Sequence, residues 1–261
     1  MDRPRIVSRD EWLVARKELL EKEKEITRRR DELSAERRRL PWVRVETRYV
    51  FDGPDGEESL ADLFDGRSQL IVYHFMFAPE WEEGCRSCSF LADHIDGTLV
   101  HLAHRDVTLL AVSRAPYPKL GAFGKRMGWR FKWVSSYRND FNRDYCVSFT
   151  KEDVAKGDTY YNYEKRKHPS EAEAPGTSVF YQDAAGNVFH TYSSYARGGD
   201  LLLGAYNYLD LVPKGRDEEG LAFTMAWVRH HDRYDDGHGI ERTQPHQPPA
   251  SSESACCAEK G

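Results

Sequence analysis

The sequence predicts an α/β protein in which helices flank a central mixed sheet, and three observations support this prediction. Two apolar runs of strand length, residues 69–77 and 106–113, enclose a segment with helical spacing, as in a βαβ unit with parallel strands. Two further strand-like runs, 176–183 and 188–192, are joined by turn residues. A helical pattern over 201–211 follows them. A right-handed crossover is the strongly favoured topology for the βαβ unit.

Residues 1–41 are predicted to form a charged helical arm. Ser8 and Glu11 have the spacing of a capping box, and the segment ends at Leu40 and Pro41. The arm is expected to be either a solvated helix along one edge of the molecule or a homodimer contact. Its arginine runs are interleaved with acidic residues, so a solvated face is favoured over nucleic-acid contact. Its thin apolar stripe consists of Trp12, Ala15, Leu19, Ile26 and Leu33.

The segment 42–234 is predicted to form one domain. Alternating polarity over 43–51 predicts a half-buried strand, and 59–64 has the pattern of a short helix. After the βαβ unit, 119–127 continues as a helix before the two later strands and the last helix. The order βαβα followed by ββα is that of a thioredoxin fold, so a thioredoxin-like α/β domain is expected.

Two cysteines at CxxC spacing, Cys85 and Cys88, lie between the first buried strand and a helical pattern over 87–95. Three interpretations compete: a dithiol redox site, half of a zinc site, or two small buried residues at the start of a packed helix. A zinc site would need two more ligands, and none stands near in sequence. The placement between a strand and a helix favours the redox site.

The start of a helix favours the thiolate form of Cys85, because unpaired backbone N–H groups and the positive end of the helix dipole face it. Arg86 adds a positive charge beside Cys85, whereas Glu82 and Glu83 favour the protonated thiol. The sequence does not decide between these opposing effects. Cys85 and Cys88 are predicted as catalytic residues because of their CxxC spacing, and Arg86 because of its positive charge beside Cys85.

Two regions add to the predicted fold. Residues of about 131–175 form an insertion rich in aromatic side chains, either a lid over the dithiol or, as we favour, a loop that covers a sheet edge. Residues 235–261 have the composition of a disordered tail that ends in Cys256 and Cys257. Adjacent cysteines in such a tail have little geometric specificity for a metal, so no metal site and no cofactor are predicted.

Composition restricts the class of protein. The 261 residues have a formal net charge of −5, which gives no general attraction to nucleic acid or membrane. The N-terminus leads directly into a charged helix without a secretory apolar region, and no apolar run is long enough to span a bilayer. Five cysteines, an odd number, argue against a secreted disulfide framework. The expected location is therefore the reducing cytoplasm.

The chain resembles the bacterial family known as domain of unknown function 899 (DUF899), whose members are often labelled predicted dithiol-disulfide oxidoreductases of thioredoxin-like fold. The resemblance extends over nearly everything from Trp12 to Tyr234. It implies that fold, with Cys85 as the attacking cysteine and Cys88 as the resolving cysteine. The segments that carry it are LADLFDGRSQLIVYHFMFAPEWEEGCRSCSFLADHIDG, RDVTLLAVSRAP, MGWRFKWVSS, FNRDY, GTSVFYQDAAGNVFHTYSSYARGGD and GAYNYLDLVPKGRDE.

The chain departs from thioredoxins around the dithiol. The two residues between the cysteines are not the Gly and Pro of thioredoxin. His74 lies near the position of thioredoxin's buried acid, and it is either a neutral proton acceptor for Cys88 or a core histidine bonded to a backbone carbonyl. Thr177, two residues after Pro175, is expected at the position that faces the dithiol. Thr177 and Trp81 are predicted to bind substrate.

The predicted function is that of a thiol-disulfide oxidoreductase acting on a disulfide-containing protein or a small thiol substrate, with an unidentified electron donor. One alternative is a peroxidase, in which Cys85 becomes a sulfenic acid that condenses with Cys88. However, Pro79 and Glu83 do not reproduce the residues that peroxiredoxins place before their cysteine. The other alternative is a non-catalytic binding protein on a thioredoxin scaffold. No nucleic-acid or membrane partner is expected.

Overall fold

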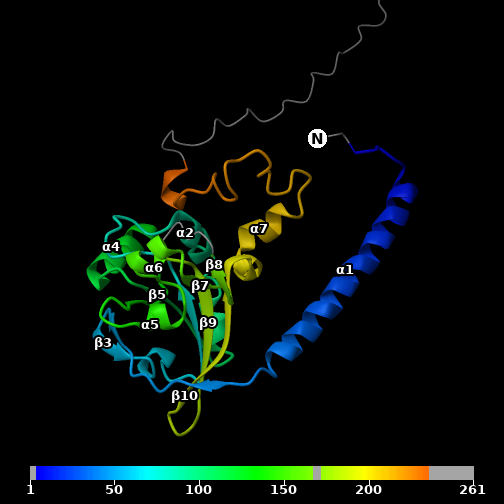
Figure 1. Ribbon diagram of the computed structural model, residues 1–261. Coiled ribbons are helices and arrows are strands. Elements are labelled where there is room, and N and C mark those ends of the chain that lie inside the picture. The colour runs from blue at the N-terminus through cyan, green and yellow to red at the C-terminus, as the bar shows by residue number, and fades with distance from the viewer. Residues whose placement is uncertain (1–3, 167–171, 235–261) are drawn as a thin grey trace, which may run out of the picture.

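The computed structural model describes residues 4–166 and 172–234, so the predicted tail with Cys256 and Cys257 lies outside the described residues (Figure 1). Ten strands and ten helical segments are assigned within these ranges. The strands are β1 (Val43–Arg44), β2 (Val50–Gly53), β3 (Gly56–Ser59), β4 (Gln69–His74), β5 (Val107–Ser113), β6 (Trp133–Ser135), β7 (Thr159–Tyr161), β8 (Glu164–Arg166), β9 (Gly176–Gln182) and β10 (Val188–Tyr195). The α-helices are α1 (Arg9–Arg37), α2 (Arg86–Ala92), α3 (Leu99–Ala103), α4 (Tyr117–Met127), α5 (Phe141–Asp144), α6 (Lys151–Lys156) and α7 (Gly204–Leu209), and the 3₁₀ helices are η1 (Asp62–Phe64), η2 (Ala196–Leu202) and η3 (His231–Arg233).

Eight of the strands form one mixed sheet in the order β1-β10-β9-β4-β5-β6-β2-β3. β4 and β5 are parallel and are connected through α2, as the apolar runs predicted. β9 lies antiparallel to β4 on its other side, and β10 is antiparallel to β9. The central order β5-β4-β9-β10, with α2 after β4 and α7 after β10, is the thioredoxin arrangement. The predicted fold class is therefore confirmed.

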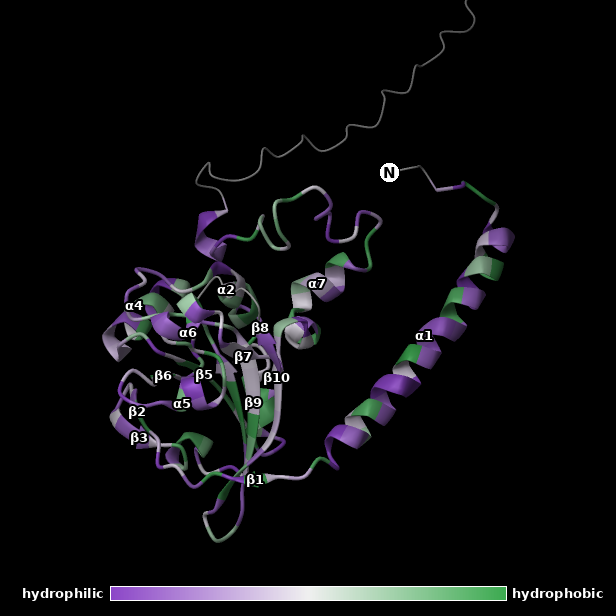
Figure 2. Cartoon of the chain, viewed as in Figure 1, coloured by the Kyte–Doolittle hydropathy of each residue, from purple (hydrophilic) through white to green (hydrophobic). Residues whose placement is uncertain are grey.

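α1 begins as the sequence predicts. The backbone N–H of Glu11 donates to the Ser8 hydroxyl over 3.2 Å, and the Glu11 carboxylate accepts from the backbone N–H of Ser8, which completes the capping box. None of its 29 residues is buried, and the helix stands apart from the body of the molecule instead of packing along an edge (Figure 1). Figure 2 shows isolated hydrophobic residues in a mostly hydrophilic helix. The homodimer contact stays a prediction.

The predicted strand over 43–51 forms two short strands at opposite sides of the sheet. β1 pairs with β10, whereas β2 pairs with β6 and β3. The chain crosses from one side to the other between them, and the apolar side chains of its second half become buried. Tyr49 packs edge-on against Phe141, with ring centroids 5.0 Å apart, and its hydroxyl donates to Asp144. The alternating pattern therefore predicted the burial of Tyr49 and Phe51 correctly, but Val43 is exposed and the strand is not continuous.

The segment predicted as an insertion contributes to the central sheet. β6 lies parallel to β5, and Phe131 and Trp133 are buried in the core. Phe141 and Tyr161 are buried as well, and the Tyr161 hydroxyl donates to the carbonyl of Pro175 over 2.6 Å. These aromatic side chains pack beneath and beside the sheet. They do not form a lid over the cysteines.

Two apolar clusters cover the two faces of the sheet. One contains Tyr73 and Phe75 of β4 and its continuation, together with Cys88 of α2, and the other contains Leu70 and Val72. Alternate residues of a strand face opposite sides, which explains this division. After α7, residues 210–234 run over α2 with little regular structure (Figure 1). Within residues 4–166 and 172–234, no helix is both long and apolar enough to cross a membrane.

Candidate functional site

The two cysteines of the CxxC motif lie at the start of α2, and both are reduced. Cys85 is the N-cap residue and is half-buried. Its backbone N–H donates to the carbonyl of Met76 over 3.0 Å, which ties the loop to the end of β4. Cys88 lies one turn further and is only 1% exposed. The two thiols therefore differ in access to solvent, although three positions separate them.

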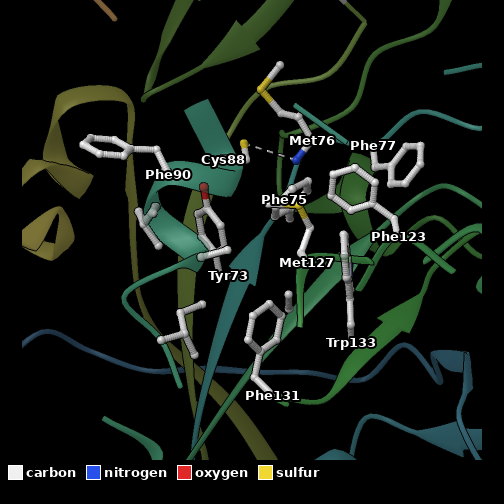
Figure 3. Close-up of a cluster of buried hydrophobic side chains, with 14 of the residues drawn as sticks. Tyr73, Phe75, Met76, Phe77, Cys88, Phe90, Phe123, Met127, Phe131 and Trp133 are labelled. Atoms are coloured by element: carbon white, nitrogen blue, oxygen red, sulfur yellow. Dashed lines mark hydrogen bonds between the residues drawn. The ribbon is translucent and has the colours of Figure 1, made fainter. Parts of the chain in front are cut away.

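Cys88 has two hydrogen-bond donors and one neighbouring thiol around its sulfur. The backbone N–H of Met76 donates to Cys88 Sγ over 3.4 Å (Figure 3), and the Tyr73 hydroxyl forms a hydrogen bond with the same sulfur. Burial raises the pKa of Cys88 well above its usual range, and the adjacent Cys85 raises this pKa further. The Tyr73 and Met76 hydrogen bonds act in the opposite direction.

This arrangement gives the two cysteines different chemistry. Cys88 keeps its proton at neutral pH, because burial and the neighbouring Cys85 raise its pKa. Burial and the two cysteines raise the pKa of Tyr73, so its hydroxyl remains a donor. Tyr73 and the Met76 N–H are thus placed to stabilise negative charge on Cys88 whenever that thiol loses its proton.

His74 does not lie beside Cys88. It follows Tyr73 in the strand and therefore faces the opposite side of the sheet, where its Nε2 lies 2.8 Å from the Ser178 hydroxyl. Its ring lies against Phe141 and Tyr145, with centroids 5.6 and 6.0 Å away. Burial lowers the pKa of His74 to about 3, so it is neutral. The position beside Cys88 that was predicted for His74 is occupied by Tyr73.

A cavity of about 520 Å³ opens beside the two cysteines. The start of α2, the start of β9, η2 and α7 contribute to its wall, together with the ends of β4 and β10 and parts of the segment 216–225. Thr177 lines this cavity, as does Pro175, whose peptide bond is trans. Arg86 is exposed at the first position of α2 and is not a lining residue.

Trp81 is not among the residues that line this cavity. It packs against the apolar cluster that contains Cys88, and its carbonyl accepts a hydrogen bond from Lys119 Nζ over 2.9 Å. The structure therefore brings Thr177 to the dithiol and places Trp81 in the support of the loop.

The end of the described chain holds the loop that precedes Cys85. His230, which is 3% exposed, donates from Nε2 to the carbonyl of Gly84 over 2.9 Å. Arg126 donates to the other ring nitrogen of His230 over 2.9 Å. Gly84 is needed here, because a Cβ on it would lie 2.7 Å from the Phe75 ring.

Glu83 does not act on Cys85 as an isolated carboxylate. Its oxygens form ion pairs with Arg126 and Arg233, each at 2.5 Å. Burial raises the pKa of Glu83, but the hydrogen bonds from Arg233 and Arg126 together lower it below its usual range. The sequence analysis expects the negative charge of Glu83 to disfavour the thiolate of Cys85. In the structure two arginines neutralise that charge.

A family model described as bacterial protein of unknown function (DUF899) matches residues 1–234. The chain belongs to this family. A comparison with curated proteins found no match for this DUF899 chain.

Several solved structures are similar to this DUF899 domain. Peroxidoxin BcpB from Mycobacterium tuberculosis is 13% identical, with a TM-score of 0.42 over 63% of this chain and 94% of that one. A peroxiredoxin Q mutant from Xanthomonas campestris is 16% identical, with a TM-score of 0.41 over 61% and 90%. A putative thiol:disulfide interchange protein DsbE from Chlorobium tepidum is 14% identical, with a TM-score of 0.35 over 58% and 86%.

Sequence reasoning missed Tyr73 and His230 in this DUF899 chain. Tyr73 could have been suspected, because a hydroxyl inside a buried apolar strand needs a partner. The strand pattern separates Tyr73 from His74 but does not say which face meets the CxxC helix. His230 contacts a residue 146 positions away, and no local pattern marks that pairing.

Proposed function

We propose that this protein is a thiol-disulfide oxidoreductase in which Cys85 attacks the substrate and Cys88 resolves the mixed disulfide. The observation that carries the proposal is the unequal environment of the pair. Cys85 is half-buried at a helix N-cap and lines a cavity, while Cys88 is buried and retains its proton. The attacking sulfur must be reachable as a thiolate, and the resolving sulfur needs to be reactive only afterwards.

In the first step the Cys85 thiolate attacks one sulfur of a substrate disulfide. A bond forms between Cys85 Sγ and that sulfur, the substrate S–S bond breaks, and the other half leaves as a thiolate that takes a proton from water. Thr177, on the cavity wall beside the dithiol, is placed to contact the bound substrate.

In the second step Cys88 Sγ attacks Cys85 Sγ, and the proton of Cys88 passes to the substrate thiolate that leaves. The Cys85–Cys88 disulfide forms, and the second half of the substrate leaves as a thiolate that is then protonated. Tyr73 and the Met76 N–H, which already donate to Cys88 Sγ, stabilise the charge that develops there. The net change is oxidation of the dithiol and two-electron reduction of the substrate disulfide. A cellular dithiol of lower reduction potential returns the protein to its starting state.

Mass spectrometry of single-cysteine variants tests this division of roles. The variants are built in a background with Cys256→Ser and Cys257→Ser, so that Cys85, Cys88 and Cys146 are the cysteines that remain. After treatment with bis(2-hydroxyethyl) disulfide, Cys88→Ser should accumulate a mixed disulfide on Cys85. Cys85→Ser should accumulate almost none, because Cys88 is buried. Cys146→Ser is the matched control and should form the Cys85–Cys88 disulfide like its parent.

Equal trapping by Cys85→Ser and Cys88→Ser would overturn the assignment of attacker and resolver. Absence of a reversible Cys85–Cys88 disulfide in the parent would overturn the oxidoreductase function itself. Hydrogen peroxide is the comparison oxidant. Oxidation of Cys85 to a sulfenic acid by peroxide, much faster than its reaction with any disulfide, would support the peroxidase alternative instead.

A further inference from the structure

We infer that the substrate of this dithiol is a small, uncharged organic disulfide that binds in the cavity beside Cys85. The inference rests on the proposed function and specifies its substrate class. It is carried by the size of the cavity, by its apolar lining and by the pairing of its charged side chains.

The first argument is the shape of the site. The cavity of about 520 Å³ lies within the range of roughly 300–1,000 Å³ that is typical of small-molecule sites. Its wall includes Leu203, Tyr206 and Met225 from the part of the chain that follows β10. A disulfide held within a folded protein would have to reach Cys85 past this wall, whereas a small disulfide can enter the cavity.

The second argument is the chemistry of the lining. Met76, Leu91 and Met225 contribute thioether and aliphatic surface, and Tyr73 and Tyr206 contribute aromatic rings. Thioether and aromatic side chains make favourable, adaptable contacts with sulfur and carbon chains. Such a lining favours the organic groups on both sides of a disulfide bond.

The third argument is charge. Asp200 lines the cavity together with Arg197 and Arg216, and its carboxylate pairs with both, at 2.9 and 3.2 Å. Arg216 also pairs with Asp210 at 2.8 Å and lies over the Tyr206 ring at 3.9 Å. An anionic substrate would have to displace these carboxylates before it met a cation. The site therefore disfavours carboxylate-bearing disulfides.

The test compares three oxidants of the reduced protein: bis(2-hydroxyethyl) disulfide, which is uncharged, glutathione disulfide, which is anionic, and insulin, a protein with disulfides. Each second-order rate of Cys85–Cys88 disulfide formation is divided by the rate of the same oxidant with dithiothreitol, which removes intrinsic reactivity. The uncharged disulfide should have a normalised rate at least about tenfold higher than either of the others, equivalent to about 1.4 kcal/mol.

A pair of matched variants tests the charge argument. Asp200→Asn removes the carboxylate that the two arginines share, so the ratio of the normalised rate with glutathione disulfide to that with the uncharged disulfide should rise roughly five- to tenfold. Asp158→Asn is the control, because Asp158 pairs with Lys165 and neither residue lines the cavity. It should leave both rates unchanged. Melting curves verify that the variants are folded.

Arg197→Glu supplies a second variant that is safe for folding, because the Arg197 side chain is 86% exposed. It should lower the ratio of the normalised rate with glutathione disulfide to that with the uncharged disulfide. The inference is overturned if insulin or glutathione disulfide reacts as fast as the uncharged disulfide after normalisation, or if the two aspartate variants behave alike. Failure of all three oxidants to form the Cys85–Cys88 disulfide would instead overturn the proposed function.

Discussion

Tyr73 and His74 are neighbours in β4, but they point to opposite faces of the sheet and have different contacts. Tyr73 and His74 are both buried, at 4% and 1% exposure, and each has a polar group that needs a partner. Tyr73 donates to the sulfur of Cys88 and lines a cavity, whereas His74 is bonded to Ser178 among aromatic rings. The comparison shows that burial of a titratable group does not by itself make a site. A reactive partner and a route for substrate are also required.

The difference between these faces is expected to appear most strongly in the second step of the proposed reaction. Tyr73→Phe removes the hydroxyl donor to Cys88 with little change in side-chain volume, so formation of the Cys85–Cys88 disulfide from the mixed disulfide should slow by roughly 10- to 100-fold. The first attack by Cys85 should change little. Rapid mixing with bis(2-hydroxyethyl) disulfide, acid quenching and mass spectrometry give both rates.

His74→Gln is the matched control for that experiment. Its amide can still bond to Ser178, and it lies on the other face of the strand. Both steps should proceed at the rates of the parent protein. If His74→Gln slowed resolution as much as Tyr73→Phe in folded protein, the effect would not be specific to the face that carries Cys88. That outcome would contradict the role of the Tyr73 hydroxyl in stabilising charge on Cys88.

Loss of the hydrogen bond between His230 and Gly84 is expected to have a smaller effect on the rate of attack by Cys85. His230→Asn can keep an acceptor for Arg126 but loses the donor to Gly84, which corresponds to about 1 kcal/mol or roughly a fivefold slower attack by Cys85. His230→Gln keeps a donor near the Nε2 position and should recover most of that rate. Melting curves on the same samples separate positioning from stability. Equal rates for the two variants would contradict a specific role of the Gly84 contact.

The face of β4 that carries His74 is expected to affect the stability of the folded protein at acid pH. The pKa of His74 is about 3 in the folded protein, below its ordinary value of 6.5, so the unfolded chain binds the proton more tightly. Stability associated with neutral His74 is therefore complete above pH 6.5 and is lost as the pH falls toward 3. Relative to the parent, His74→Gln should gain about 2 kcal/mol between pH 7 and pH 5. Urea unfolding at the two pH values measures this gain, and identical pH dependence of both proteins would contradict it.

The sequence was sufficient for the parts of this fold that depend on local pattern. The βαβ unit, the ββ hairpin and the capped N-terminal helix follow from periodicity, turn residues and the pair of Ser8 and Glu11. The CxxC spacing likewise identified Cys85 and Cys88, which the structure brings together with Thr177 at one cavity.

The remaining features depend on contacts between distant parts of the chain. Whether Tyr73 or His74 meets α2 is decided by which side of the sheet that helix covers, and the strand pattern is the same in either case. The single strand expected over 43–51 was wrong because the alternation reports burial, which a crossing segment satisfies as well as a strand. The irregular segment over 210–234 has no periodicity from which its position could be predicted.

The hydrogen bond between His230 and Gly84 has a consequence for biosynthesis. It joins residues 146 positions apart, so the loop before Cys85 reaches its final form only after nearly the whole domain has left the ribosome. During translation the thiol of Cys85 is therefore present but not yet positioned. The last part of the domain to be made completes the loop before Cys85, and a truncated product that ends before His230 carries both cysteines without the hydrogen bond to Gly84.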